Sequence, residues 1–511
     1  FAGLEWQINE KWGLKAEYSS DAYTLETGSD IFERKSRLNF GAEYQVASGV
    51  RLGGYYLYGS EVGVNLQFLL NPKRPISQMR IPAPRPYKIR PSRSSDPQAY
   101  SRDWAVSEAA ASVEVRDALI PLLEAEGLTL IEARTTASTV EVRYSNERYR
   151  PTSVSVGRVA RLLAAIMPAS VETFRIVPVV NDLAQSVVVF RRSDLEALEV
   201  SPNSPDALLA VTGFENASST LSGSAKNEAL FPSFNWSIGP YLKRRFFDPN
   251  EPVRFDAGVE LNLSYQPAPG WTIAGQVQHR LTGSFDETLG KNDSLLPRVR
   301  SDTVLYDRGG DTSLTQLYVS RQWKSTPDIY TRFSAGYLER AFGGVSAEAL
   351  WKPVSSRLAL GVEANYVKQR AFDSVLKFQD YSVATGHASA YYEFNNGYLG
   401  QVDVGRYLAG DVGVTVSLER EFNNGWRVGG FFTKTDASSE EFGVGSFDKG
   451  ITLTIPFDWM FGKPDTRTRS TTIRPFTRDG GAKLDAPGRL YEQVRSGHRA
   501  NLVGNWSGVW E

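Results

Sequence analysis

The sequence predicts an all-β fold, a large transmembrane antiparallel β-barrel of meander connectivity, with a small α/β domain inserted into it. Three observations lead to this prediction: long segments that alternate apolar and polar residues, repeated short turns flanked by aromatic residues, and the lack of a long apolar run. Hydrophobic residues are 41% of the 511 residues, and the mean hydropathy is -0.32. No stretch approaches the roughly 20 apolar residues of a spanning helix, whereas barrel strands alternate and escape a hydropathy average.

The alternation has a period of two, which is typical of β-strands. Every second residue from Leu38 to Val46 is apolar, and the residues between them are polar or glycine. Residues 255–267, 357–367 and 411–422 repeat the pattern. The polar face combines small, hydroxyl, amide and charged side chains, which suits a wet lumen with the apolar face toward lipid.

A soluble β-sandwich gives the same local alternation, with its apolar face inward. Strand length favours the barrel. Several predicted strands run to roughly 10–13 residues, whereas a soluble strand has about 5–6 and a tilted membrane strand needs about 9–11.

The turns repeat as well. The segments EFNNGY (393–398) and EFNNGW (421–426) are near copies, and Asn-Gly is a strong hairpin signal because both central residues tolerate positive φ. We interpret the flanking aromatic residues as one interfacial girdle; ordinary hairpin punctuation in a β-meander is the alternative. The short turns define an inner side, and the longer connections lie on the opposite side, as in bacterial barrels.

Following the chain from one side of the sheet to the other through these turns gives roughly 17 strands, about five before the insert and about twelve after it. Bacterial single-chain barrels have even strand numbers, and Phe1 opens directly into strand-like sequence without a signal peptide. We therefore expect a truncated N-terminus, with at least one strand missing upstream.

The chain divides by composition. The predicted parts are barrel strands in 1–70, a Pro/Arg-rich linker in 71–103, the α/β domain in 104–200, a linker in 201–229, barrel strands in 230–457 and a polar tail in 458–511. The first linker is interpreted as a stiff spacer; contact of its basic run with phospholipid or an acidic polymer is the alternative. The tail is expected on the periplasmic side or folded back into the lumen.

The α/β domain repeats the order helix–strand–strand. Segment 112–128 predicts an amphipathic helix ended by Gly127, and segment 155–167 predicts a second helix ended near Pro168. Two predicted strand pairs follow the two helices, which implies a small two-layer sandwich. It contains neither His nor Cys, so a docking module is favoured over an enzyme.

Catalytic signals are weak throughout. The chain has no Cys and three His, His279, His387 and His498, without metal-ligand spacing or a G-x-S-x-G motif. We expect no enzymatic activity, no cofactor and no metal, and a net charge of -1 gives no general attraction to nucleic acid.

The loop 283–312 is rich in charges of both signs. A solvated external loop is the simple interpretation. The functional alternative is a folded-in constriction that guides a charged polymer, with Arg298, Arg300 and Arg308 as the residues that face an anion.

Several motifs together resemble one family. They are GLEWQINEKWGLKAEYSSDAY, WSIGPYLKRRFFDP, VLYDRGGDTSLTQLYVSRQWK, YTRFSAGYLERAFGGVSAEALWKP and RPFTRDGGAKL. In this order, across nearly the whole chain, they are similar to the YjbH/GfcD family of outer-membrane proteins. Members are typically lipoproteins larger than this chain, and their lipid-bearing Cys is not present here. The resemblance implies a role in exopolysaccharide or capsule secretion by Gram-negative bacteria, but no catalytic residue.

Our leading hypothesis is a non-enzymatic outer-membrane barrel that assists export or surface assembly of an exopolysaccharide, with the insert and tail in the periplasm. Its partners would be an anionic or neutral polysaccharide, outer-membrane lipid and periplasmic secretion components. The first alternative is a plugged, non-conducting scaffold that recruits those components. The second is a polymer-modifying enzyme, which the low His content disfavours.

Overall fold

The computed structural model describes the whole chain except residues 1, 25–26, 28–32, 48, 70, 74, 76–80, 247–252, 286–293, 374–375, 443–446 and 475–478. The chain forms two compact units, Phe1–Ile76 and Ser77–Glu511, and each is described by itself. Within the described residues, no helix has the length and apolar character that crossing a membrane requires.

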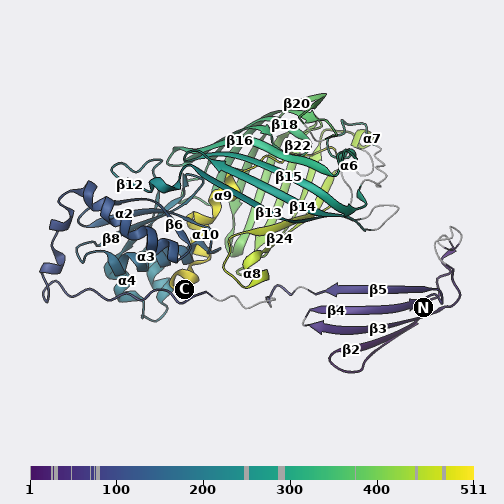
Figure 1. Cartoon of the computed structure of the whole chain (residues 1–511), viewed down its shortest axis with the longest axis horizontal. Coiled ribbons are helices and arrows are strands. Elements are labelled where there is room, and N and C mark those ends of the chain that lie inside the picture. The colour runs from purple at the N-terminus through teal and green to yellow at the C-terminus, as the bar shows by residue number, and fades with distance from the viewer. Residues whose placement is uncertain are drawn as a thin grey trace. The chain divides into compact units, whose positions relative to one another are not determined.

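The first unit is an antiparallel sheet in which neighbours in sequence are neighbours in space (Figure 1). Its strands are β1 (Ala2–Gln7), β2 (Trp12–Tyr18), β3 (Leu38–Ala47), β4 (Val50–Leu57) and β5 (Glu61–Phe68). The predicted alternation is visible in β3, where Phe40 is exposed while Asn39 and Glu43 are buried. Glu43 accepts a hydrogen bond from Tyr55 at 2.6 Å and pairs with Lys15 at 2.9 Å. Polar contacts therefore cover one face, and apolar side chains stay exposed on the other.

The second unit contains a 13-stranded antiparallel sheet in sequence order. Its strands are β13 (Ser233–Phe246), β14 (Val253–Gln266), β15 (Trp271–Gly283), β16 (Thr312–Thr326), β17 (Ile329–Tyr337), β18 (Phe342–Trp351), β19 (Leu358–Arg370), β20 (Phe378–Glu393), β21 (Tyr398–Arg406), β22 (Val412–Glu421), β23 (Arg427–Thr435), β24 (Asp448–Pro456) and β25 (Thr468–Ile473). The predicted antiparallel meander is confirmed. The expected count of about twelve strands is close, and β25 lies in the segment that was assigned to the tail.

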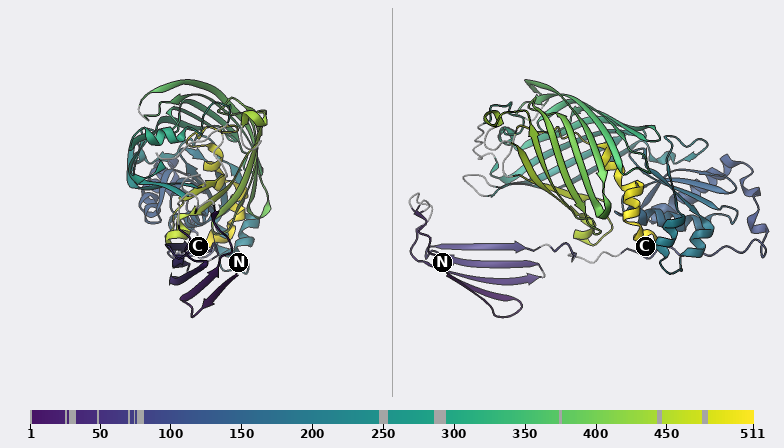
Figure 2. Two further views of the ribbon diagram at one scale, coloured as in Figure 1. Left: turned by 90° about the vertical axis from the view of Figure 1, so that its right-hand side faces the viewer. Right: turned by 180° about the vertical axis from the view of Figure 1, so that it is seen from behind.

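The large sheet is strongly curved (Figure 2), but it is open in the part of the chain that the structure describes. β13 and β25 are its outer strands, and no ladder joins them there. In a meander of 13 strands the first and the last strand run in the same direction, so they cannot close an antiparallel ladder with each other. The closed barrel expected from the sequence is therefore not seen.

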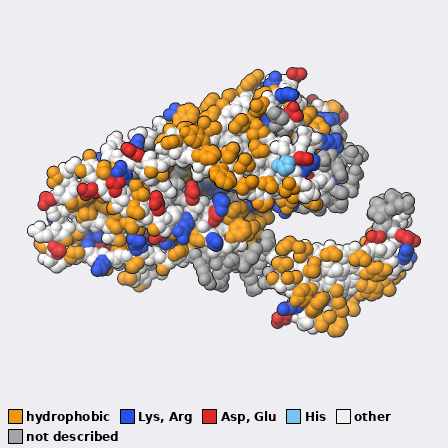
Figure 3. Space-filling model, in the orientation of Figure 1, with side chains coloured by type: hydrophobic (Ala, Val, Ile, Leu, Met, Phe, Trp, Pro, Cys, Tyr) orange, Lys and Arg blue, Asp and Glu red, His pale blue; other side chains and the backbone are white. Residues whose placement is uncertain are grey.

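The two faces of this sheet have inverted polarity for a soluble protein. On the outer face, Val362 is 59% exposed and Val404 is 52% exposed, whereas Arg332 and Ser346 on the concave face are fully buried. Figure 3 shows hydrophobic side chains gathered over the outer face of the sheet that is turned to the viewer. The apolar half of the alternation thus faces outward, as the sequence predicted.

The α/β domain is a sheet covered on one face by helices (Figure 1). Its strand order is β11-β10-β8-β7-β6-β12, with β9 paired to β8. The elements are α2 (Glu108–Ala125), β6 (Leu128–Thr135), β7 (Thr139–Asn146), α3 (Thr152–Ile166), β8 (Thr173–Val180), β9 (Leu183–Ala184), β10 (Ser186–Arg191), α4 (Arg192–Leu198), α5 (Ser204–Val211), β11 (Gly213–Asn216) and β12 (Ala225–Lys226). The expected order helix–strand–strand occurs twice.

Local sequence explains how α2 begins and ends. The Ser107 side chain accepts a hydrogen bond from the Ala110 backbone N–H, which satisfies one of the free donors at the start of a helix. Gly127 follows the last turn with φ of +70°, a conformation that glycine adopts without strain. Leu119 and Leu123 lie between these ends and are fully buried in the domain core.

The α/β domain extends beyond the boundaries expected from composition. Residues 201–229, interpreted as a linker, contain α5, β11 and β12, and both strands pair with the domain sheet. The Ser- and Asn-rich composition hid them, although Leu208 on α5 is fully buried. The first linker is not a free spacer either. Tyr87 packs against the domain core, and Arg90 pairs with Glu196 at 3.0 Å.

The C-terminal segment, residues 479–511, folds back rather than extending away. Its elements are α9 (Leu490–Val494), η6 (Arg495–Gly497), α10 (Arg499–Gly504) and η7 (Trp506–Trp510). Leu490 packs with side chains of the large sheet, while Trp506 and Val509 belong to the core of the α/β domain. The remaining short helices are η1 (Gln98–Tyr100), η2 (Asp103–Ala105), η3 (Glu228–Leu230), α6 (Thr303–Arg308), η5 (Asn395–Gly397), α7 (Ser439–Phe442) and α8 (Phe457–Phe461).

Candidate binding cavity on the concave face

The concave face of the large sheet carries a buried polar network around Arg332. Arg332 on β17 is fully buried, and its Nε lies 3.0 Å from Glu348 Oε2 on β18. The same guanidinium donates to the hydroxyls of Ser334 and Ser346, both at 3.0 Å. These residues occupy alternate positions of two paired strands, so period-two alternation places them on one face. A buried charge is stable only when it is paired and hydrogen-bonded, and this network meets that condition.

The C-terminal segment supplies the groups that cover this face. The Leu490 backbone N–H donates to Glu348 at 3.1 Å, and Lys483 Nζ lies 3.2 Å from Asp403 on β21. Further along, Arg495 Nη2 lies 2.7 Å from Glu421 on β22. The segment is therefore held by ion pairs to carboxylates on several strands.

An aromatic contact adds to these ion pairs. The rings of Tyr391 on β20 and Tyr491 on α9 are stacked, with centroids 3.9 Å apart and planes 7° apart. The Tyr491 hydroxyl also donates to Glu393 at 2.9 Å. Aromatic pairs contribute about 0.5–1.5 kcal/mol beyond buried area, so this contact helps to hold α9 on the sheet.

Of the three arginines predicted to guide a polymer, Arg300 is held in a dense network. It forms a bidentate pair with Glu339 (Nη1–Oε1 2.6 Å, Nη2–Oε2 2.9 Å). It also donates to the Lys483 carbonyl at 2.8 Å. Burial opposes the charged form, but the Glu339 carboxylate raises the pKa of Arg300 above its usual range. Arg300 thus links the loop to the sheet and to the C-terminal segment.

The other two arginines lie elsewhere. The Arg298 side chain is 57% exposed, with Asp302 at 3.6 Å, and Arg308 is exposed at the end of α6. The structure does not bring the three guanidinium groups together around one passage. Of the remaining loop charges, Asp286, Glu287, Lys291 and Asp293 lie outside the described residues.

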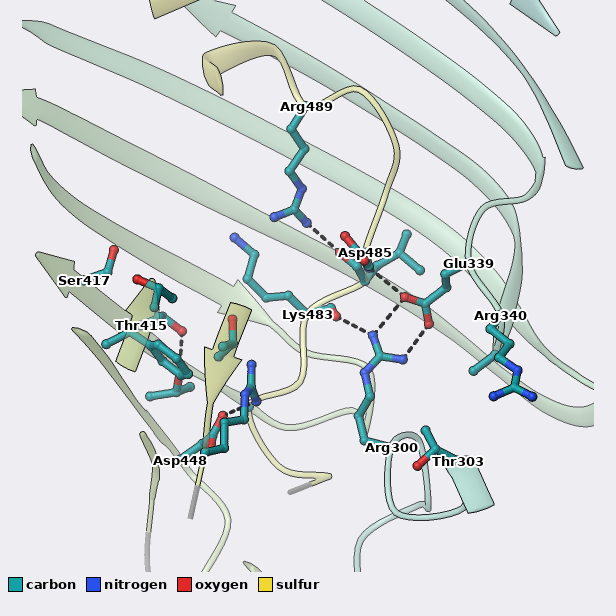
Figure 4. A pocket seen from close by; sticks show the side chains of 18 residues that line it. Arg300, Thr303, Glu339, Arg340, Thr415, Ser417, Asp448, Lys483, Asp485 and Arg489 are labelled. Atoms are coloured by element: carbon teal, nitrogen blue, oxygen red, sulfur yellow. Dashed lines mark hydrogen bonds and ion pairs between the residues drawn. The ribbon is translucent and has the colours of Figure 1, made fainter. Parts of the chain in front are cut away.

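A cavity of about 630 Å³ lies between the concave face and the C-terminal segment. In Figure 4, Lys483 and Arg489 extend from the C-terminal segment, and Arg300 meets Glu339. The lining of the cavity includes hydroxyl side chains of β22 to β25. The charged residues of the lining are Arg300, Arg340, Arg474, Lys483 and Arg489 against Glu339, Asp448 and Asp485, five cations against three carboxylates.

Burial changes the acidity of the groups that the C-terminal segment contributes. It lowers the pKa of Lys483 below its usual range. It also raises the pKa of Asp485, and the nearby Glu339 carboxylate adds to this rise. Arg489 keeps its charge, because Glu363 and Glu348 raise its pKa against the effect of burial. The cavity is therefore polar and richer in cations than in anions.

The three histidines lie in different surroundings. His279 Nδ1 is 2.8 Å from the Thr312 hydroxyl, His387 is buried against the Tyr407 ring, and His498 Nε2 is 3.0 Å from the Tyr330 hydroxyl. Among the described residues, no group of three or more His, Cys, Asp and Glu side chains is arranged to hold a metal ion.

Sequence reasoning missed the cavity. It identified the loop and considered a tail folded into the lumen, but not the pairing of Lys483 with Asp403 or of Arg489 with Glu363. The available signal was a row of carboxylates on the polar face of alternating strands, together with the excess of Lys and Arg in the predicted tail 458–511. That signal indicates attraction between the two, but it does not indicate which residues meet.

These features define a class of protein: an antiparallel β-protein with an apolar outer face, a polar concave face covered by its own C-terminal segment, and an appended α/β domain. The chain belongs to the YjbH family, described as exopolysaccharide biosynthesis protein YbjH, whose model matches residues 1–496. The resemblance drawn from the motifs is thereby confirmed.

A similar protein is the uncharacterized lipoprotein YjbH of Escherichia coli (strain K12), with 30% identity over 97% of this chain and 70% of that protein. Among solved structures, OccK11 (OpdR) of Pseudomonas aeruginosa gives a TM-score of 0.26 at 10% identity, covering 48% of this chain and 82% of that chain. A loop-deletion mutant of OmpT, an outer membrane protein of Vibrio cholerae, gives a TM-score of 0.24 at 9% identity, covering 43% and 86%. Both structural likenesses are weak.

Proposed function

We propose that this chain is an outer-membrane protein that assists export or surface assembly of an exopolysaccharide without catalysing a reaction. The observation that carries the proposal is the inverted polarity of the large sheet. Its apolar side chains, such as Val362, Val404 and Leu418, are exposed on the outer face, while charged side chains are buried on the concave face. The chain also belongs to a family that is described as an exopolysaccharide biosynthesis protein, which supports a role in that process.

The outer face supports insertion into lipid. A soluble monomer rarely exposes a contiguous apolar patch larger than a few hundred Å². Strands β13 to β24 have 9 to 16 residues, enough for the roughly 9–11 that a tilted membrane strand needs. Closure of this wall into an antiparallel barrel requires an odd number of additional strands.

The contacts of the α/β domain support a periplasmic position. The domain meets the sheet at the end that carries the short turns. Arg150 Nε lies 2.8 Å from Asp458 after β24, and the Val354 N–H donates to Asn216 at 2.8 Å. Lys324 near the end of β16 donates to the Ala184 carbonyl at 2.9 Å. Because short turns face the periplasm in bacterial barrels, the α/β domain and the C-terminal end would lie there.

The concave face supports contact with a hydrated polymer, but the C-terminal segment occupies it in this structure. Export along this face therefore requires that the segment move. Tyr491 and Arg495, which hold it, make contacts that a local displacement can break and re-form. The same contacts favour a second candidate function, a closed scaffold in which the C-terminal segment ties the sheet to the α/β domain permanently.

A reversible lock on the C-terminal segment separates the two candidates. Because the chain has no Cys, the pair Tyr391→Cys and Tyr491→Cys can be bridged selectively by a short bifunctional thiol reagent with a cleavable linker. Export predicts that bridging lowers secreted polysaccharide per folded protein and that cleavage restores it. Equal secretion with and without the bridge would contradict export along this face and favour the scaffold. Each single-cysteine variant, treated identically, is the control.

A further inference from the structure

The lining of the cavity has an uneven distribution of charge. Lys483 and Arg489 line the cavity, whereas the carboxylates that they contact, Asp403 and Glu363, are not part of its lining. Arg340 likewise lines it, while its partner Asp307 does not. The cationic members of these pairs thus line the cavity, and low-dielectric walls strengthen the field there.

The lining also matches the neutral part of a sugar. Thr415, Ser417 and Thr433 contribute hydroxyl groups, which donate and accept hydrogen bonds. The Thr415 and Thr433 hydroxyls lie 2.8 Å apart and bond to each other, so each has part of its capacity left for a ligand. Phe431 contributes an aromatic ring that also contacts the Arg474 guanidinium, 4.9 Å from the ring centroid. A volume of about 630 Å³ lies within the range of small-ligand pockets, about 300–1,000 Å³.

We propose that this cavity binds an acidic sugar residue of the exported polymer, with Lys483 and Arg489 contacting its carboxylate and the strand hydroxyls contacting its hydroxyls. This inference rests on the proposed function and adds the chemical class of the ligand. The cations are presented by the same segment that would have to move during export, so occupation of the cavity and the position of the segment are coupled.

The ion pair at Lys483 allows a sharp test. Asp403 also accepts hydrogen bonds from Ser389 at 2.5 Å and from Gln401 at 2.9 Å. Lys483→Gln therefore removes a cation from the cavity, while the two hydrogen-bond donors to the Asp403 carboxylate remain. Lys377→Gln removes a cation whose side chain is 76% exposed outside the cavity, and it is the matched control.

The measurement is calorimetric titration of the purified full chain with trigalacturonate and with its fully methyl-esterified, neutral counterpart. We expect trigalacturonate to bind, the ester to bind at least tenfold more weakly, and Lys483→Gln to weaken trigalacturonate binding about tenfold, as for one charge-assisted hydrogen bond. Lys377→Gln should bind as the unaltered chain does. Added salt should weaken binding of the acid more than binding of the ester.

Three results would overturn the inference: no binding of trigalacturonate, equal binding of the acid and the ester, or equal loss in Lys483→Gln and Lys377→Gln. Failure here is distinguishable from failure of the proposed function. If bridging the C-terminal segment lowers secretion while trigalacturonate does not bind, the proposed role in export is retained. Only the proposal of an acidic sugar as the ligand is then rejected.

Discussion

Arg300 and Glu339 form a bidentate ion pair, with Nη1–Oε1 at 2.6 Å and Nη2–Oε2 at 2.9 Å, between the loop 284–311 and the turn that joins β17 to β18. Glu339 Oε2 also accepts the backbone N–H of Asp485 at 2.8 Å. This ion pair and the hydrogen bond to Asp485 thus connect a long loop, the turn between β17 and β18 and the C-terminal segment.

Arg300→Gln should destabilise the folded chain by about 3–5 kcal/mol, because it leaves the buried Glu339 carboxylate without its partner. Arg298→Gln should change stability by less than about 0.5 kcal/mol, because that side chain is exposed. Urea unfolding followed by tryptophan fluorescence measures both. Equal stability of the two variants would contradict the structural role of Arg300. Any test of polymer guidance in this loop should therefore use Arg298 and Arg308, and leave Arg300 in place.

Val404→Arg tests whether the outer face lies in lipid. Val404 is 52% exposed on β21, and an arginine on a lipid-facing strand costs about 2–4 kcal/mol near the bilayer midplane. Val200→Arg in the α/β domain is the control, because Val200 is 90% exposed and surface changes in water cost less than about 0.5 kcal/mol. The stability of both variants is measured in lipid vesicles. If Val404→Arg costs no more than Val200→Arg, the outer face is in water.

Single cysteines test the orientation, since the chain has none of its own. Val106 in the α/β domain is 85% exposed. The side chain of Lys377, between β19 and β20, is 76% exposed. On intact cells, a membrane-impermeant maleimide should label Lys377→Cys and not Val106→Cys, because short turns face the periplasm. The reverse pattern would place the α/β domain outside the cell.

The sequence was sufficient to predict most of the fold, because buried and exposed positions differ in residue type and alternate along each strand. Alternation predicts strands such as β19 and β22, since one face of each has to differ from the other. It fails for β25, whose sequence TRSTTI has almost no apolar residue to mark a face. The helix α5 was also missed, because it lies in a Ser- and Pro-rich segment. The burial of Leu208 is the main observation that assigns it to the domain.

The cavity could be predicted only in part. Composition indicated a polar concave face and a basic tail over residues 458–511. The ion pair between Lys483 and Asp403, however, joins residues 80 positions apart, and electrostatic attraction alone does not select among the many carboxylates of that face. The place of Arg300 was missed for a related reason, because a charged loop residue is usually solvated and its buried partner Glu339 lies in a different turn.

His498 provides a prediction about pH. Its ring is buried between the C-terminal segment and the large sheet, and Nε2 lies 3.0 Å from the hydroxyl of Tyr330. Burial, aided by the charges of Lys352 and Lys324, lowers the pKa of His498 well below its ordinary value of about 6.5. The folded chain therefore disfavours the imidazolium, while an unfolded chain accepts the proton at about pH 6.5.

The sign of the effect follows from this difference. Above about pH 6.5 the ring is neutral in both states, so the stability is fully present. As the pH falls below that value, only the unfolded state binds the proton, and stability decreases by up to about 1.4 kcal/mol per pH unit. Between pH 7.5 and 5.5, the free energy of unfolding should fall by about 1.4 kcal/mol more in the unaltered chain than in His498→Gln, which keeps a hydrogen-bonding group for Tyr330 but does not titrate. Urea unfolding at the two pH values measures the difference, and parallel losses in both chains would show that His498 titrates normally in the folded state.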